Sequence, residues 1–168
     1  MNTFLPFADF IRSASCLDKR RCFKQVVETY QILNVLDGKS AGWKYHPTIL
    51  MWTGYRDCLQ YYYNTFYDYC KNIHGIKFVK LPIPILLPKY MNYPKWLGYP
   101  PFHLTMQRNL VRKADEDKQK GREELGQRLF IHLSTNYHGL EPANGYLWPV
   151  NKNGLLPEIE EWYNEQNF

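Results

Sequence analysis

The sequence lacks several motifs that define large enzyme classes. Its four cysteines have no C-x-x-C spacing and His74 is the only histidine near them, so a zinc site is not expected. Ser-His-Asp, P-loop and glycine-rich dinucleotide motifs are also missing. We therefore expect no metal and no cofactor. The cysteines are expected to be free, partly buried thiols in a reducing compartment; they are Cys16, Cys22, Cys58 and Cys70.

The sequence also has no long apolar run. The longest such stretch, residues 81–88, is interrupted by three prolines and is too short to cross a membrane. Residues 1–6 have neither the basic region nor the apolar run of a signal peptide. These absences predict a soluble, intracellular protein without a membrane partner.

The chain is instead rich in aromatic and basic residues. Its 168 residues are 45% hydrophobic and 17% aromatic, which is enough to build a core without disulfides or metals. Residues 157–168 carry four glutamates and no base, which leaves 21 bases against 12 acids in the rest. A basic body favours a polyanion such as nucleic acid, although ordinary surface lysines give the same balance. We expect one domain over residues 1–168, with 157–168 as an acidic C-terminal tail.

Helical periodicity without alternating strands predicts an all-α fold. We expect a compact bundle of about three main helices with long irregular connections. Residues 76–100 contain too many prolines for a regular helix. An aromatic stripe in the second long helix is expected to face the core. The expected helices are 7–14, 17–36, 47–71, 101 to at least 113 and as far as 130 if Gly121 and Gly126 do not end it, and 157–164.

The first candidate constellation is a basic run that ends in a carboxylate. Lys24 and Glu28 are four residues apart, so they share one helix face after Arg20 and Arg21. The spacing alone fits an exposed ion pair. It also fits a catalytic carboxylate within a basic, phosphate-binding rim, which would stabilise positive charge that develops on a sugar.

A second constellation precedes the helix that starts at Pro47. His46, in Trp43-Lys44-Tyr45-His46-Pro47, is placed to bind phosphate at a helix N-terminus or to carry a proton. A structural histidine bonded to a neighbouring loop explains the position equally well.

The third constellation is a polar helix face in the second half of the chain. His103 and Gln107, like Arg108 and Arg112, are four residues apart, and Lys113 follows. Such a face can lie along a phosphate backbone, and it can equally be an ordinary solvated surface.

Short motifs spread from residue 2 to residue 149 carry a resemblance. They are Asn2-Thr3-Phe4-Leu5-Pro6, Leu17-Asp18-x-Arg20-Arg21-x-x-Lys24-Gln25-x-x-Glu28, Gly42-Trp43-x-x-His46-Pro47-x-x-x-Met51-Trp52-x-Gly54-Tyr55, Pro94-x-Trp96-Leu97-Gly98, Arg108-Asn109-Leu110-x-Arg112-Lys113 and Tyr146-x-Trp148-Pro149. Together they resemble the pyrimidine dimer DNA glycosylase (phage T4 endonuclease V-like) superfamily, and most closely a bacterial branch of it.

This resemblance implies an all-α, metal-free DNA glycosylase with AP-lyase activity. The implied partner is double-stranded DNA with a lesion or modified base. The protein is expected to be a monomer, cytoplasmic and nucleoid-associated, in a bacterial or phage-infected cell. In the family the α-amine of the mature N-terminus is the nucleophile, and a glutamate that matches Glu28 assists it. The residues expected to contact DNA are Arg20, Arg21, Lys44, His46, Tyr55, His103, Gln107, Arg108, Arg112 and Lys113.

The implied chemistry is physically reasonable. An α-amine has an ordinary pKa of about 7.7–8.0, against about 10.4 for lysine, so part of it is neutral and nucleophilic near pH 7. It would attack C1′ of an extruded nucleotide and form a Schiff base, while Glu28 stabilises charge and moves protons.

Two departures from the family leave alternatives open. Methionine removal before the bulky Asn2 is inefficient, so Met1 or Asn2 could supply the amine, with Lys24 as a substitute if its pKa is lowered. Val26 and Val27 stand where the family usually has an arginine before its glutamate. The competing hypotheses are a DNA-binding module without catalysis and an enzyme that acts on modified nucleobases or nucleotides.

Overall fold

The computed structural model describes residues 1–133, 137 and 139–166. In this part of the chain the fold is mainly helical, with one very small antiparallel sheet that pairs Val150 with Leu155. The predicted all-α class is confirmed. The elements are α1 (Phe10–Ser15), α2 (Lys19–Leu36), α3 (Pro47–Trp52), α4 (Arg56–Asn72), α5 (Pro100–Gln119), α6 (Glu124–Leu133), β1 (Val150–Asn151), β2 (Gly154–Leu155) and α7 (Pro157–Gln166).

The predicted single helix over 47–71 is wrong, because the chain forms two helices there. α3 ends at Thr53, whose backbone is extended, and Gly54 follows with φ of 86°. This left-handed conformation suits glycine, which has no Cβ to clash. α4 then starts in a new direction and packs against α2 and α1.

The third long helix also ends earlier than its longest predicted extent. α5 stops at Gln119, and Gly121 turns the chain with φ of 73°. The Arg122 amide bonds back to the Asp117 carbonyl oxygen, which closes the end of the helix. α6 then folds back against α5. Gly126 lies inside α6 without ending it.

An aromatic core lies between the helices. The stripe predicted in the second helix is buried, and Trp96 reaches it from the segment before α5, where its indole nitrogen bonds the Met51 carbonyl oxygen at 2.9 Å. All four cysteines are fully buried rather than partly buried, and burial raises the pKa of the Cys16 and Cys58 thiols to about 12. These thiols are therefore poor nucleophiles at neutral pH.

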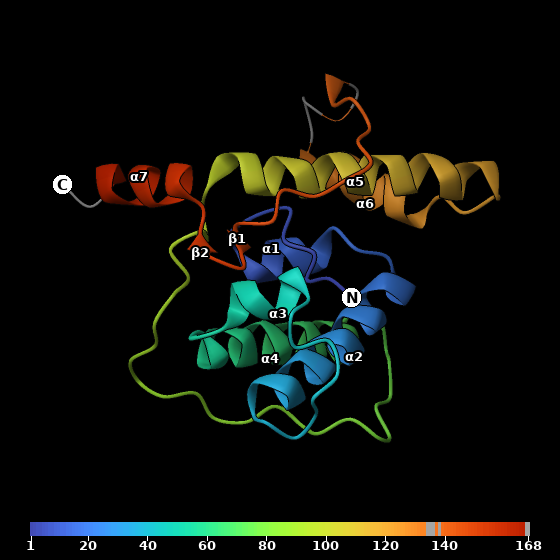
Figure 1. The fold of residues 1–168 in the computed structure, drawn as a ribbon. Helices are drawn as coiled ribbons and strands as arrows, with labels where there is room; N and C mark the ends of the chain where they lie inside the picture. Colours follow the sequence, from blue (N-terminus) through green and yellow to red (C-terminus); the bar gives the residue numbers. More distant parts are fainter. Residues whose placement is uncertain (134–136, 138, 167–168) are drawn as a thin grey trace.

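Figure 1 shows how the layers are arranged: α5, α6 and α7 form one layer, and α2, α3 and α4 form another. The segment 76–99 runs around the outside of the second layer without regular structure, as its prolines predict. The chain start lies between α2 and α5. Its extended residues 2–6 are buried, which is unusual for a chain terminus.

The acidic C-terminal tail is largely helical and docked. Within it, α7 buries Ile159 completely, and Lys95 forms a 2.8 Å ion pair with Glu160. Trp162 packs edge-on against Tyr99, just before α5. Among the helices of the described residues, none is both long and apolar enough to cross a bilayer.

Candidate active site

The first long helix presents Glu28 toward the chain start. Asp18 caps α2, because its carboxylate accepts a hydrogen bond from the Arg21 amide. From this fixed start, Gln25 and Thr29 point into the protein, and Glu28 lies at the edge of the buried face with only 12% of its side chain exposed. A carboxylate in such a place is shielded from bulk water but can still meet a ligand.

Hydrogen bonds from α2, α3 and their neighbours hold the chain start in an extended form. Gln25 accepts a 2.8 Å bond from the Phe4 amide. The Thr48 hydroxyl donates to the Met1 carbonyl oxygen at 3.3 Å. The Trp52 indole donates to the Thr3 hydroxyl at 3.0 Å. These bonds fix the position of the first residues, which is a condition for any reaction at the terminal amine.

The other side of the chain start is held by α5. His103 bonds the Leu5 carbonyl oxygen through Nδ1 at 2.7 Å, and its Nε2 accepts from the Gly98 amide at 2.9 Å. Burial lowers the pKa of His103, and the opposing effect of the hydrogen bond to Leu5, which raises the pKa, is smaller. Gln107 donates to the Pro6 carbonyl oxygen at 2.7 Å. In the structure these two side chains hold the chain start in position, and their contact with DNA stays a prediction.

The central feature of the site is an amine beside a carboxylate. The terminal nitrogen of Met1 lies 3.8 Å from Glu28 Oε1. The backbone nitrogen of Asn2 donates to Glu28 Oε2 at 3.3 Å. Lys24 Nζ lies 3.7 Å from Glu28 Oε1, but its side chain is 67% exposed. The structure therefore brings together the four predicted catalytic residues, Met1, Asn2, Lys24 and Glu28.

These four residues line a cavity of about 530 Å³. One carboxylate, that of Glu28, faces four side-chain cations from α2 and α5. Such a lining has a positive local potential that attracts phosphates. The residues that line the cavity are Met1, Asn2, Phe4, Arg20, Arg21, Lys24, Glu28, Lys113, Tyr146 and Trp148.

The arginines of the rim are anchored by a buried aspartate on α5. Asp117 bonds Arg21, forms a 3.5 Å ion pair with Arg20 and accepts a 2.7 Å bond from Arg122. Burial raises the pKa of Asp117, but the bonds from Arg21 and Arg122 outweigh it and lower the pKa to about 2. Asp117 stays ionised at neutral pH, so it fixes the guanidinium of Arg21 between α2 and α5.

Lys113 enters the cavity from α5. Its ammonium lies 5.9 Å from the centre of the Phe4 ring. Burial, followed by the positive charges of Arg112 and Arg21, lowers its pKa. Lys113, which was predicted to contact DNA, is part of the cavity wall in the structure.

Arg108 and Arg112 hold a later segment of the chain against α5. Arg108 donates to the Glu141 carbonyl oxygen at 2.9 Å, and Arg112 to that of Ala143 at 3.1 Å. The segment so held delivers Tyr146 and Trp148 to the cavity. Sequence reasoning did not assign these two aromatic residues to the site, although both stand in the Tyr146-x-Trp148-Pro149 motif.

His46 caps the short helix α3 next to the site. Its Nδ1 accepts from the Thr48 amide at 3.2 Å, and its ring touches Trp148 edge-on at 5.9 Å between centres. Burial and the nearby terminal amine lower its pKa, whereas Glu28 raises it. Lys44 is exposed in the preceding loop. Tyr55 lies at the start of α4 and is not among the described residues that line the cavity.

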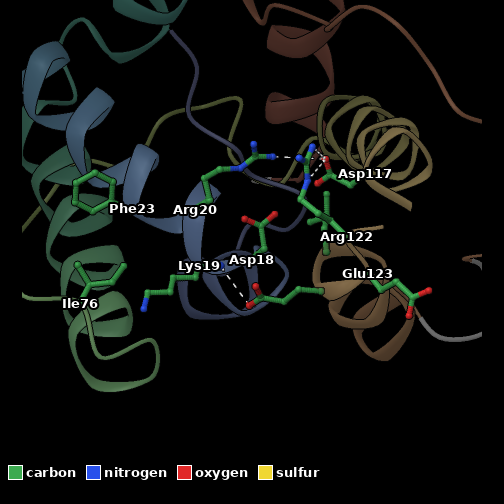
Figure 2. A pocket seen from close by; sticks show the side chains of 10 residues that line it. Asp18, Lys19, Arg20, Phe23, Ile76, Asp117, Arg122 and Glu123 are labelled. Atoms are coloured by element: carbon green, nitrogen blue, oxygen red, sulfur yellow. Dashed lines mark hydrogen bonds and ion pairs between the residues drawn. The ribbon is translucent and has the colours of Figure 1, made fainter. Parts of the chain in front are cut away.

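Arg20 also lines a second cavity, of about 770 Å³ (Figure 2). Its apolar part is formed by Phe23, Ile76 and Leu125. Four carboxylates face three cations there, and Figure 2 shows Arg20 and Arg122 both directed at Asp117. This lining is less suited to a polyanion than the smaller cavity, so the smaller one is the better candidate for a DNA-processing site. Among the described residues, no group of three or more His, Cys, Asp or Glu side chains is arranged to hold a metal ion.

Comparison with known proteins gave a match over the part of the chain that contains the amine and Glu28. No curated protein and no solved structure gave a significant match. A sequence family described as pyrimidine dimer DNA glycosylase matches residues 1–78, which include Met1, Asn2, Lys24 and Glu28. The match supports a glycosylase-type function at the level of the family, with DNA as the substrate class. Over these 78 residues the chain is similar to the pyrimidine dimer DNA glycosylase superfamily, in line with the resemblance that the scattered motifs carry.

Proposed function

We propose that the protein is a DNA glycosylase with AP-lyase activity that removes a damaged or modified pyrimidine from double-stranded DNA. The observation that carries the proposal is the pairing of the chain-start amine with Glu28, 3.8 Å apart, at the wall of a basic cavity. An amine can form a covalent link with a sugar carbon, and a shielded carboxylate can stabilise positive charge and move protons.

The proposed reaction has two stages. In the first, the neutral amine attacks C1′, the bond from C1′ to the base breaks, and the base leaves with a proton. The sugar ring opens to an iminium ion, whose positive charge Glu28 stabilises. In the second, a proton is lost from C2′, the C3′–O bond breaks, and the 3′ phosphate leaves. Hydrolysis of the imine then frees the amine.

Whether Met1 is removed from the mature protein decides which nitrogen is the reacting amine. Both candidate nitrogens, of Met1 and of Asn2, lie within 4 Å of a Glu28 oxygen, at 3.8 and 3.3 Å. Loss of Met1 would therefore create a new amine beside the same carboxylate. Lys24 is the weaker candidate, because its side chain is exposed to solvent and not buried.

The alternative of a catalytically inactive DNA-binding module is favoured by one observation. The terminal amine is paired with Glu28 in the structure, and an ammonium group must lose its proton before it can attack carbon. Both proposals use the same cations for DNA binding and predict a steep loss of affinity with salt. They differ only in whether a covalent intermediate forms.

Reductive trapping separates the two proposals. The protein is incubated with a duplex that carries one abasic site, in the presence of borohydride, and the adduct is digested and mapped by mass spectrometry. We expect a stable adduct on the first residue of the mature chain, whose identity the intact mass gives. A variant extended by an acetylated N-terminal residue should lose the adduct, whereas Lys24→Met should keep it. Specific DNA binding without any adduct would refute the Schiff-base proposal.

A further inference from the structure

A row of aromatic rings leads from the protein surface into the candidate active site. It starts at Trp43 and passes to His46, with ring centres 5.7 Å apart, and then to Trp148 at 5.9 Å. Tyr146 follows at 5.7 Å and Phe4 at 6.2 Å. The last three of these rings line the cavity that contains Glu28. The row therefore connects the amine–carboxylate pair to an outer rim.

Trp43 stands at the outer end of this row in an unusual conformation. Its side chain is 68% exposed, whereas the side chains of Trp52 and Trp96 are fully buried. Within the described residues it is the one non-glycine residue with positive φ, at 64°. A 2.7 Å bond from the His46 amide to the Trp43 carbonyl oxygen closes this turn. Strained backbone of this kind persists only where the surrounding structure holds it, and it clusters at functional sites. Here the strained residue carries an exposed indole.

Basic and aromatic neighbours surround this indole in the loop. Lys44 follows Trp43 and lies with its ammonium 5.2 Å from the centre of the Tyr45 ring, which is 79% exposed. Exposed aromatic rings beside a lysine are the combination that stacks on bases while a phosphate is held nearby. A protein partner would match the aromatic surface but not the cationic lining of the adjoining cavity.

We propose that Trp43 is the wedge that enters the duplex and fills the space left by the nucleotide extruded into the cavity. This inference rests on the proposed glycosylase function. The extruded sugar would lie at the amine and Glu28, and the inner rings of the row would contact its base. Trp43, at the outer end of the same row, faces the position that the nucleotide leaves. A large flat side chain there replaces the lost stacking and slows return of the nucleotide.

The test compares a duplex with a single strand that carries the same abasic site, because only the duplex requires extrusion. The variants are Trp43→Ala and Trp43→Phe, and Tyr90→Ala is the matched control. Tyr90 is also exposed, at 82%, but lies in the segment 76–99 around the second helical layer. Single-turnover trapping rates are measured for each protein on both substrates, and circular dichroism checks that each variant is folded.

We expect Trp43→Ala to trap the duplex at least about tenfold more slowly, which corresponds to about 1.4 kcal/mol of barrier. Its rate on the single strand should stay within about twofold of the wild type. Trp43→Phe should recover most of the duplex rate, and Tyr90→Ala should change neither. Unchanged duplex trapping by a folded Trp43→Ala would overturn the wedge, as would an equal loss on both substrates. Failure of the wild type to trap either substrate refutes the proposed function instead, so the two failures are distinguishable.

Discussion

The Tyr62 hydroxyl on α4 donates a 2.6 Å hydrogen bond to the Gln25 side-chain oxygen on α2. The same Gln25 oxygen accepts the 2.8 Å bond from the Phe4 amide, and Tyr62 also lies 3.1 Å from the Phe4 carbonyl oxygen. All three groups are buried. One amide side chain therefore links α2, α4 and the chain start.

Gln25→Leu should weaken catalysis through the position of the chain start. The change leaves the Phe4 amide without its buried acceptor and leaves the Tyr62 hydroxyl with the Phe4 carbonyl oxygen alone. An unpaired buried donor costs about 1–3 kcal/mol of unfolding free energy. We expect a lower single-turnover rate of cleavage with nearly unchanged DNA affinity, because Gln25 does not line the cavity among the described residues. Denaturant unfolding and cleavage rates measure the two effects.

Tyr62→Phe is the matched control for that prediction. It removes the hydroxyl and its contacts with the Gln25 and Phe4 oxygens, but it keeps the bond from the Phe4 amide to Gln25. Its loss of cleavage rate should therefore be smaller than that of Gln25→Leu. A Gln25→Leu protein that is destabilised but cleaves at the wild-type rate would show that the chain start needs no such support.

Glu28→Gln should separate chemistry from binding. The amide keeps the size of the side chain but cannot hold a negative charge beside the developing positive sugar. We expect cleavage to fall by at least about 100-fold, while affinity for an abasic duplex stays within about threefold or rises, since one negative charge leaves a cationic cavity. Single-turnover cleavage and fluorescence anisotropy give the two values. Glu161→Gln, an exposed glutamate on α7, serves as the control. A fully active Glu28→Gln protein would remove Glu28 from the mechanism.

His103 makes the stability of the fold depend on pH. Burial lowers its pKa below the usual 6.5, against the bond to Leu5. Below about pH 6.5 the unfolded chain therefore binds more protons at this position than the folded protein does. The contribution of His103 is fully present above pH 6.5 and is lost as the pH falls through 6.5 toward its folded pKa.

We expect His103→Gln to be less stable than the wild type at pH 7.5, by about 1–3 kcal/mol for the lost buried bonds. The difference in unfolding free energy between the two proteins should become smaller as the pH falls from 7.5 to 5.5. Urea unfolding at both pH values measures it, with His132→Gln, a less buried histidine, as the comparison. A difference that stays constant with pH would mean that the His103 ring does not titrate in this range.

Much of the helical scaffold is predictable from local sequence. The first long helix was expected at 17–36 and is found at Lys19–Leu36, because Asp18 caps its start and Gly38 follows its end. The break between α3 and α4 was missed because the aromatic stripe keeps helical spacing on both sides of Gly54. Periodicity reports which residues are buried and does not report a turn that a single glycine makes.

The site was predictable only in part, because its contacts join distant parts of the chain. The spacing of His103 and Gln107 correctly places them on one face of α5. Nothing local indicates that this face meets the carbonyl oxygens of Leu5 and Pro6. The pairing of the chain start with Glu28 was expected from the family resemblance alone, since 26 residues separate Asn2 from Glu28.

The segment tethered to α5 by Arg108 and Arg112 has a consequence for the choice of base under the proposed function. It brings Tyr146 and Trp148 to a cavity whose amine and carboxylate belong to the first 78 residues, the part that matches the family. The proposed amine and Glu28 thus come from the first 28 residues, whereas two of the three rings in the cavity wall come from positions 146 and 148. Under the proposed function, substitutions of Tyr146 and Trp148 would change the shape of the cavity that receives the base and leave the amine and Glu28 unchanged.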